Sequence, residues 1–143
     1  MADVFQDFPI KASARQVFEA VSTPAGLDAW WSQNSSGQAE EGAEYKLGFG
    51  NGYEWVAKVS RFNPDTEFEF ELTSADTDWQ GTRVGFLLEE NNGVTQVRFH
   101  HTGWPVANEH YRVSCHCWAL YLRLLRRYVE RAEIVDYENR LDA

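Results

Sequence analysis

Asn108 to Ala132, NEHYRVSCHCWALYLRLLRRYVERA, is the stretch that decides the fold of this chain. It contains neither glycine nor proline, its apolar residues recur at a period near 3.6, and Asn108 is suited to cap a helix. At about 1.5 Å per residue, the helix would be roughly 38 Å long, enough to cross a small domain. Its apolar surface covers more than half of its circumference, which favours a sheet that curls around it or burial against a second subunit.

Short runs of alternating apolar and polar residues precede this helix and predict β-strands. Glycine, asparagine and proline turns separate most of them. Ser13 and Thr23-Pro24 are typical first residues of two short helices, of which the second should end near Trp30-Trp31. The predicted strands are 4–10, 45–49, 53–60, 68–72, 84–88 and 97–101, and residues 32–42 are expected to form a loop.

This order of elements predicts an α+β fold in which a curved antiparallel sheet wraps around a long C-terminal helix, with two short helices after the first strand. The length of 143 residues suits a single domain, 1–143, with a core of about 4–132 and a short charged C-terminal extension at 133–143. On one strand Glu67, Glu69 and Glu71 alternate with apolar residues, so all three glutamates are expected to face solvent.

The composition limits the classes of partner. The net charge of −9 and the pI of about 4.8 argue against binding to nucleic acid or to an anionic membrane surface. The N-terminus lacks the pattern of a signal peptide, and no apolar run is long enough to span a membrane, so we expect a cytoplasmic protein without membrane insertion. The high aromatic content, 15%, predicts a large buried aromatic volume.

Three stretches resemble the START/Bet v 1-like (SRPBCC) superfamily. The first runs from Ile10 to Val21 and continues through Thr23-Pro24 to Leu27-Asp28-Ala29-Trp30-Trp31. The second is His101-Thr102-Gly103-Trp104, and the third is the helix from Trp118 to Glu130. The branch most similar is the one named for activators of the heat-shock-protein ATPase. The resemblance implies a helix-grip fold with about seven strands and a cavity between sheet and helix that often holds apolar molecules.

The candidate ligand-binding residues are those expected to point from the sheet, the helix or the loops into that cavity, although each could instead be an ordinary core residue. Replacing Trp55 or Phe86 by alanine is expected to affect ligand retention more than folding. The candidates are Trp31, Tyr45, Phe49, Tyr53, Trp55, Phe70, Trp79, Phe86, Phe99, His101, Cys117 and Tyr121.

No metal or other cofactor is expected. His100 and His101 are consecutive on a strand and point to opposite faces, while Cys115 and Cys117 lie about 200° apart around a helix, so neither pair can chelate one ion.

The function favoured by these patterns is binding of a small apolar or aromatic molecule. One alternative is a cyclase- or dehydratase-type enzyme that uses His101 as its catalytic residue, with Arg83, Arg98 or Glu54 as a polar partner. Another is a protein-interaction or co-chaperone module, favoured if Trp118, Leu122 and Val129 form one exposed patch. A homodimer is also compatible with the sequence, because a second subunit could bury part of the wide apolar surface of the helix.

Overall fold

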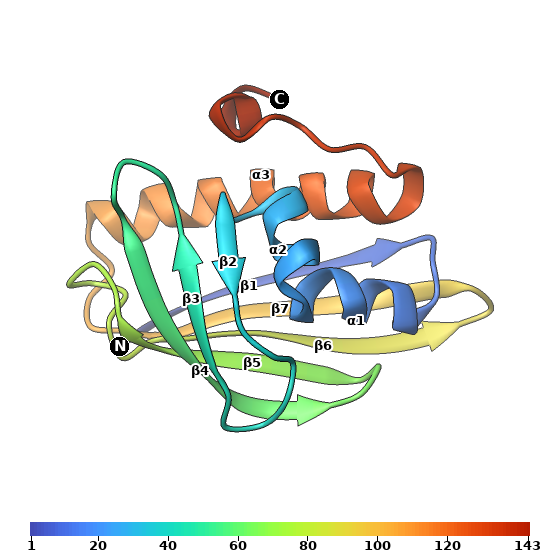
Figure 1. Cartoon of the computed structure of the whole chain (residues 1–143), viewed down its shortest axis with the longest axis horizontal. Helices are drawn as coiled ribbons and strands as arrows, with labels where there is room; N and C mark the ends of the chain where they lie inside the picture. Colours follow the sequence, from blue (N-terminus) through green and yellow to red (C-terminus); the bar gives the residue numbers. More distant parts are fainter.

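The computed structural model describes all residues from 1 to 143 and places a seven-stranded antiparallel sheet beneath one long helix (Figure 1). The strands are β1 (Ala2–Ile10), β2 (Asn34–Ser36), β3 (Glu44–Gly48), β4 (Glu54–Asn63), β5 (Glu67–Ser74), β6 (Arg83–Asn91) and β7 (Val94–Trp104). The helices are α1 (Ala14–Ser22), α2 (Pro24–Trp30), α3 (Glu109–Arg131) and the short 3-10 helix η1 (Tyr137–Asp142).

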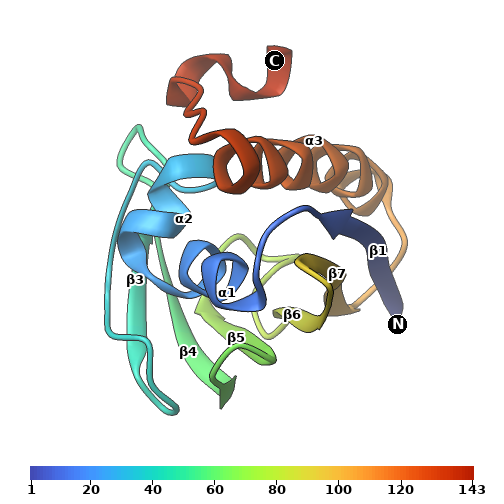
Figure 2. The same ribbon diagram turned by 90° about the vertical axis from the view of Figure 1, so that its right-hand side faces the viewer.

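The sheet has the order β1-β7-β6-β5-β4-β3-β2, so the first two strands of the chain form its two edges. Figure 2 shows the sheet curving around α1, with α3 lying along the open side of the curve. This arrangement is the helix-grip fold expected from the sequence. No helix of the structure is long and apolar enough to cross a membrane.

The two short helices begin where the sequence predicts them. The Ser13 side chain accepts a hydrogen bond from the backbone N–H of Gln16 in a complete capping box, and Thr23 caps α2. The corner between them is tight, because a Cβ atom at Gly26 would lie 2.6 Å from the carbonyl oxygens of Glu19 and Ala20. Only glycine fits this approach, which brings the end of α2 onto the sheet.

The expected loop at residues 32–42 is partly wrong, because β2 pairs with β3 at the sheet edge. Its residues are polar and too few to show an alternating pattern. Asp28 at the end of α2 stabilises the segment, since its carboxylate accepts hydrogen bonds from the backbone N–H and the hydroxyl of Ser35.

The space between the sheet and α3 is largely filled by aromatic side chains. The rings of Phe99 and Trp118 lie 4.6 Å apart, Phe86 lies 5.3 Å from Phe99, and Trp30 lies 6.1 Å from Phe86. All four side chains are buried. These side chains leave no large central cavity between the sheet and α3.

The buried residues of α3 are Ser114, Trp118, Leu122, Leu124 and Leu125. Val113 lies outside this face, and its side chain is 52% exposed. Because the apolar surface of the helix is wide, periodicity alone allows several arcs to face inward, and contact with the sheet selects one of them.

On the outer face of the sheet, Glu69 is only 5% exposed, contrary to the expectation that it faces open solvent. His100 lies 2.7 Å from one of its carboxylate oxygens, and the Ser60 hydroxyl donates to the other at 2.8 Å. Burial by itself would raise the pKa of Glu69, but these hydrogen bonds outweigh it and lower the pKa.

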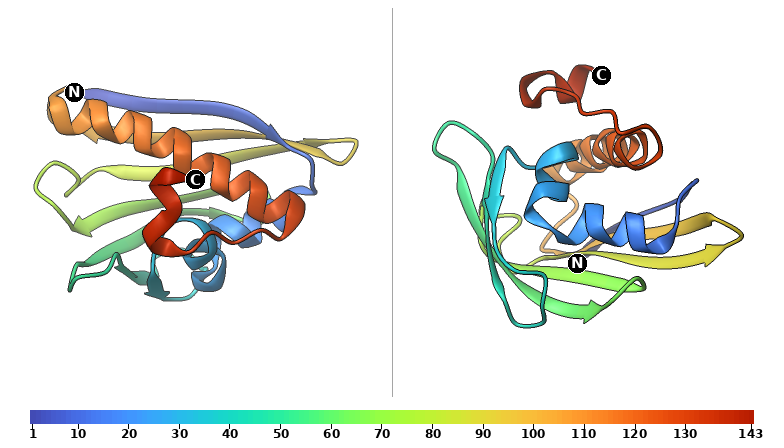
Figure 3. Two further views of the ribbon diagram at one scale, coloured as in Figure 1. Left: turned by 90° about the horizontal axis from the view of Figure 1, so that it is seen from above. Right: turned by 45° about the vertical axis from the view of Figure 1, so that its right-hand side comes forward.

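Residues 133–143 fold back over α3 instead of extending away from it (Figure 3). The guanidinium group of Arg140 is buried and donates hydrogen bonds to three backbone carbonyl oxygens, those of Asp28, Ser32 and Val135, at 2.7 to 3.0 Å. We call residues 133–143 the C-terminal strap.

Candidate functional site

A pocket of about 260 Å³ opens beside the first half of α3. Five parts of the chain build its wall: the end of α2, the β3–β4 hairpin, the loop before β6, α3 and the C-terminal strap. Nine of its 11 lining residues are hydrophobic. They are Trp31, Phe49, Trp55, Trp79, His110, Val113, Ser114, Cys117, Trp118, Tyr121 and Tyr137.

Five of these side chains form a closed ring of aromatic contacts, which we call the aromatic collar: Trp31, Phe49, Trp55, Trp79 and Trp118. Going around it in that order, neighbouring ring centroids are 5.1, 4.7, 4.9 and 5.7 Å apart, and 5.3 Å separates Trp118 from Trp31. Each side chain is held by two aromatic neighbours, so the wall is rigid and apolar.

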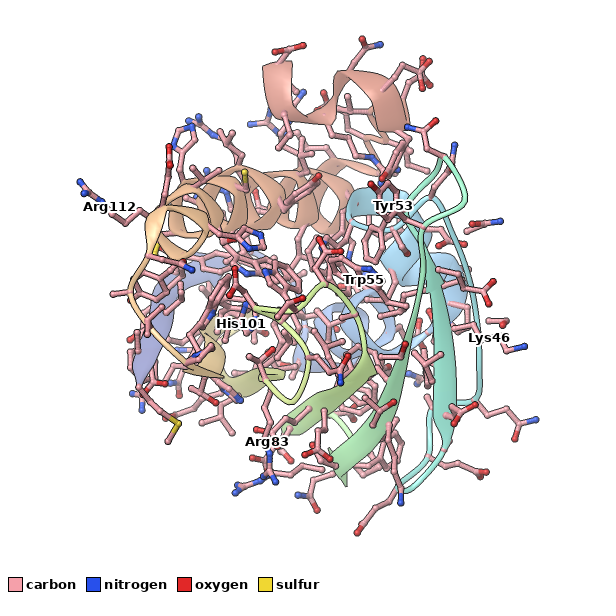
Figure 4. All side chains as sticks on the ribbon, turned by 90° about the vertical axis from the view of Figure 1, so that its left-hand side faces the viewer. Lys46, Tyr53, Trp55, Arg83, His101 and Arg112 are labelled. Carbon is pink, nitrogen blue, oxygen red and sulfur yellow. The ribbon has the colours of Figure 1, made fainter.

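His101 lies beneath α3 (Figure 4), and its ring is 4.5 Å from that of Trp79 and 5.9 Å from that of Trp118. Its Nδ1 accepts a hydrogen bond from the Trp118 indole N–H at 3.0 Å, and its Nε2 lies 2.8 Å from the Thr82 hydroxyl oxygen. Because the Thr82 hydroxyl donates to the carbonyl oxygen of Trp79, Nε2 carries the proton and donates to Thr82. Burial, with smaller contributions from the charges of His100 and His110, lowers the pKa of His101 to about 3.

This network leaves His101 neutral with both ring nitrogens occupied. Its hydrogen bonds connect Trp118 on α3 to Thr82 and Trp79 in the loop before β6, and so join two sides of the collar. The polar partners considered for an enzyme do not converge on it. Arg83 points outward and lies 3.7 Å from Glu69, and Arg98 and Glu54 are exposed.

The structure brings together six of the candidate ligand-binding residues and separates the other six. Tyr45, Phe70, Phe86 and Phe99 are buried in the core away from the pocket, and His101 is shielded by the collar. Tyr53 was expected to point inward, but it is 58% exposed because it lies at the turn of the β3–β4 hairpin. Those that line the pocket are Trp31, Phe49, Trp55, Trp79, Cys117 and Tyr121.

Sequence reasoning missed five lining residues: His110, Val113, Ser114, Trp118 and Tyr137. The four on α3 share a face with Cys117 and Tyr121, so helical spacing from those two residues could have identified them. Tyr137 carries no such signal, because it belongs to the charged tail. Its hydroxyl donates to the carbonyl oxygen of Phe49 at 2.5 Å, which fixes the strap to the β3–β4 hairpin.

A hydrogen-bonded pair holds the loop before β6 against the start of α3. Nδ1 of His110 lies 2.9 Å from an Asp78 carboxylate oxygen, and the Asn108 side chain donates to the same oxygen at 3.4 Å. The hydrogen bond from His110 is the largest contribution that lowers the pKa of Asp78. Trp79, the next residue after Asp78, is thereby fixed in the pocket wall.

Besides His110 and the indole N–H groups, the polar groups of the wall are the hydroxyls of Ser114 and two tyrosines and the thiol of Cys117. Burial raises the pKa of Tyr121 to about 12 and also raises the pKa of Cys117. These groups are therefore neutral near pH 7, and the wall contains no carboxylate, lysine or arginine.

Comparison with known protein families finds one match. A family model described as Activator of Hsp90 ATPase homolog 1-like protein matches residues 11–130. These residues include every wall element except the C-terminal strap. A search of curated proteins finds no match.

Solved structures support the same fold. The Aha1 dimer from Colwellia psychrerythraea shares 28% sequence identity and superposes with a TM-score of 0.81, covering 93% of this chain and 99% of that one. Protein BH1534 of Bacillus halodurans shares 25% identity at a TM-score of 0.75, with 91% and 98% covered. CalU16 from Micromonospora echinospora shares 17% identity at a TM-score of 0.72, with 91% of this chain and 77% of that one covered. At this low identity the similarity shows the fold alone.

Proposed function

This chain belongs to the Activator of Hsp90 ATPase homolog 1-like family, and from that premise together with its pocket we propose that it binds a small apolar molecule containing an aromatic ring. The observation that carries the proposal is a pocket of about 260 Å³ whose wall includes the five side chains of the aromatic collar. Ligand pockets of proteins are concave, mostly apolar and equipped with a few polar groups, and this pocket has each property.

The size of the pocket restricts the ligand. Pockets for drug-sized molecules hold roughly 300–1,000 Å³, so a space slightly below that range suits a compound of one or two fused rings better than a sterol or a long lipid. The packed centre of the molecule supports this restriction, because Phe86 and Phe99 occupy the space that a larger ligand would need.

Titration with the neutral fluorescent dye N-phenyl-1-naphthylamine tests the proposal. We expect saturable binding by the native protein and about tenfold weaker binding by Trp55→Ala, because this variant opens the collar at two of its contacts. Tyr53→Ala is the matched control, since Tyr53 lies on the same hairpin but faces solvent. Equal dye binding by native protein and Trp55→Ala would contradict the proposed site.

The co-chaperone alternative has less support from the geometry. Its expected signature was one exposed patch of Trp118, Leu122 and Val129, but the first two side chains are buried. A related proposal, that two copies of this chain associate, draws on the dimer formed by the Colwellia protein. Native mass spectrometry would test it, because a subunit count of one at micromolar concentration would reject the dimer and any retained small molecule would appear in the same spectrum.

A further inference from the structure

Strand β1 forms one edge of the sheet, and part of that edge is free to pair with another chain. Pro9 has no N–H to offer a neighbouring strand, so its backbone faces away from β7. Backbone directions alternate along a strand, so Phe5 and Asp7 also direct their N–H and C=O groups away from β7. Both residues are exposed, and no turn or loop backbone hydrogen-bonds to them.

The β6–β7 hairpin leads to the same assignment. Its turn has two residues, which makes Val94 a hydrogen-bonded partner of β6. Arg98 follows Val94 by an even number of residues, so it also directs its backbone toward β6. Asp7 lies opposite Arg98 on β1, and its backbone must therefore point to the free edge.

A groove of about 250 Å³ lies between β1 and α3, and we call it the β1 groove. Helix α3 starts close to the strand, where the Tyr111 hydroxyl donates to the carbonyl oxygen of Asp3 at 2.6 Å, and the two elements separate beyond that point (Figure 3). Phe8, Ala119 and Leu120 supply apolar surface to the groove. None of its lining residues belongs to the pocket with the aromatic collar.

Basic side chains of α3 line the β1 groove. Arg123 and Arg126 form no salt bridge, although the chain carries a net charge of −9, and His116 lies beside them on the helix. Residues three apart on a helix lie roughly 5–6 Å apart, and alternate residues of a strand lie about 7 Å apart. Two carboxylates at alternate positions of an extended chain therefore match the two arginines.

The carboxylate of Asp7 does not neutralise these arginines. Val4 and Ile10 are buried, so the even-numbered side chains of β1 face α3 and the odd-numbered ones lie on the outer face of the sheet. Asp7 therefore projects to the same outer face as Phe5, whose side chain is 67% exposed. The face toward α3 is basic, whereas the outer face offers an exposed aromatic ring.

We propose that the β1 groove binds an extended acidic peptide, which adds to the free edge of β1 as an antiparallel strand. The peptide backbone pairs with Phe5 and Asp7. Carboxylates on one face of the peptide meet Arg123 and Arg126, and apolar side chains on its other face pack beside the Phe5 ring. This binding site goes beyond the proposed function, because the groove and the pocket share no residue.

A second copy of this chain fits the β1 groove less well. Opposite residues of an antiparallel strand pair project to the same face of the sheet. The β1 strand of another copy would therefore present Gln6 and Phe8 to the arginines, and its carboxylates would lie on the outer face. An acidic peptide supplies the charge that a second β1 lacks.

Isothermal titration calorimetry with short capped peptides tests the proposal. A peptide in which glutamate alternates with valine should bind, and the same peptide with lysine in place of glutamate should not. In the proposed arrangement the valine N–H groups face β1 and the glutamate N–H groups face solvent. Methylation of the valine backbone nitrogens should therefore weaken binding by at least about tenfold, whereas methylation of the glutamate nitrogens should change it little.

Two double variants test the placement of the peptide. Arg123→Gln/Arg126→Gln should weaken binding of the glutamate peptide by about fivefold. Lys46→Gln/Arg131→Gln makes the same change in net charge at two exposed residues outside the groove and should leave binding near native. Titration with N-phenyl-1-naphthylamine should match the native protein in both variants, which shows that they fold and reports on the proposed function separately.

Each result bears on a different part of the proposal. Equal binding of the glutamate and lysine peptides, or native affinity in the arginine variant, would overturn the role of charge. Full affinity of the valine-methylated peptide would overturn strand addition. Failure of the glutamate peptide to bind would overturn the whole inference and leave the proposed function standing. A dimer that this peptide dissociates in sedimentation velocity would assign the groove to a second copy instead.

Discussion

At the scale of single residues, His101 shows how an inward position can be predicted while its role cannot. Alternation along the last strand correctly places the side chain inside. Its two partners, Trp118 and Thr82, lie on different elements, and their distances depend on how α3 is seated on the sheet. The resulting network makes His101 a support for the collar.

The low pKa of His101 predicts acid sensitivity. Because its pKa falls from 6.5 to about 3 on folding, the unfolded chain binds a proton between these values and the folded protein does not. The contribution of neutral His101 to the free energy of unfolding is fully present above pH 6.5 and declines as the pH falls toward 3. Between pH 7.5 and 5 this residue should therefore reduce the free energy of unfolding by about 2 kcal/mol.

Urea unfolding of the native protein and His101→Gln at both pH values measures this contribution. Glutamine can hydrogen-bond but does not titrate, so its variant should lose about 2 kcal/mol less stability than the native protein over the same pH interval. An identical pH dependence in the two proteins would show that His101 does not cause the acid sensitivity.

At the scale of elements, the C-terminal strap departs most from expectation. Its charged sequence predicted a short extension, yet Tyr137 lines the pocket and Arg140 is buried against the end of α2. Buried arginine is rare, and no local pattern distinguishes Arg140 from an exposed one. Three carbonyl acceptors, two of them more than 100 residues away in sequence, compensate its burial.

Replacing Arg140 by methionine should release the strap. The variant keeps an unbranched apolar side chain but loses the three hydrogen bonds, so amide exchange in residues 133–143 should accelerate by at least about tenfold. Dye affinity should also fall, because Tyr137 would leave the pocket wall. Hydrogen–deuterium exchange with mass spectrometry measures the first effect.

Arg131→Met is the control for this prediction. Arg131 is exposed in the last turn of α3, and its side chain forms no salt bridge or hydrogen bond. It should leave exchange in the strap unchanged. Strap exchange that is equally slow in Arg140→Met and native protein would mean that the arginine does not hold the segment.

At the scale of the whole molecule, the interior divides into a packed centre and a pocket at one end. Phe86 belongs to the centre, where it contacts Trp30 and Phe99, whereas Trp55 belongs to the collar and is only partly buried. From the sequence, both residues were predicted to contact a ligand, because both are aromatic and alternate with polar neighbours on their strands.

The two alanine variants should therefore behave differently. Phe86→Ala should reduce the free energy of unfolding by about 3–5 kcal/mol, because it creates a cavity in a packed core. Trp55→Ala should weaken dye binding while costing much less stability, because its side chain already borders open space. Chemical denaturation and dye titration of both variants check this division, and a similar loss of stability in the two would contradict it.

The order of the elements and the helix caps could be predicted from the sequence, because periodicity, turn residues and capping patterns are local signals. The helix-grip fold was implied by the resemblance to a known superfamily. The short strand β2, the burial of Glu69, the C-terminal strap and the boundary between core and pocket required the tertiary structure. Each depends on how side chains from distant segments share one space. Six of the candidate residues line the pocket, but the ring of contacts among four of them is completed by Trp118, which depends on how α3 packs against the curved sheet.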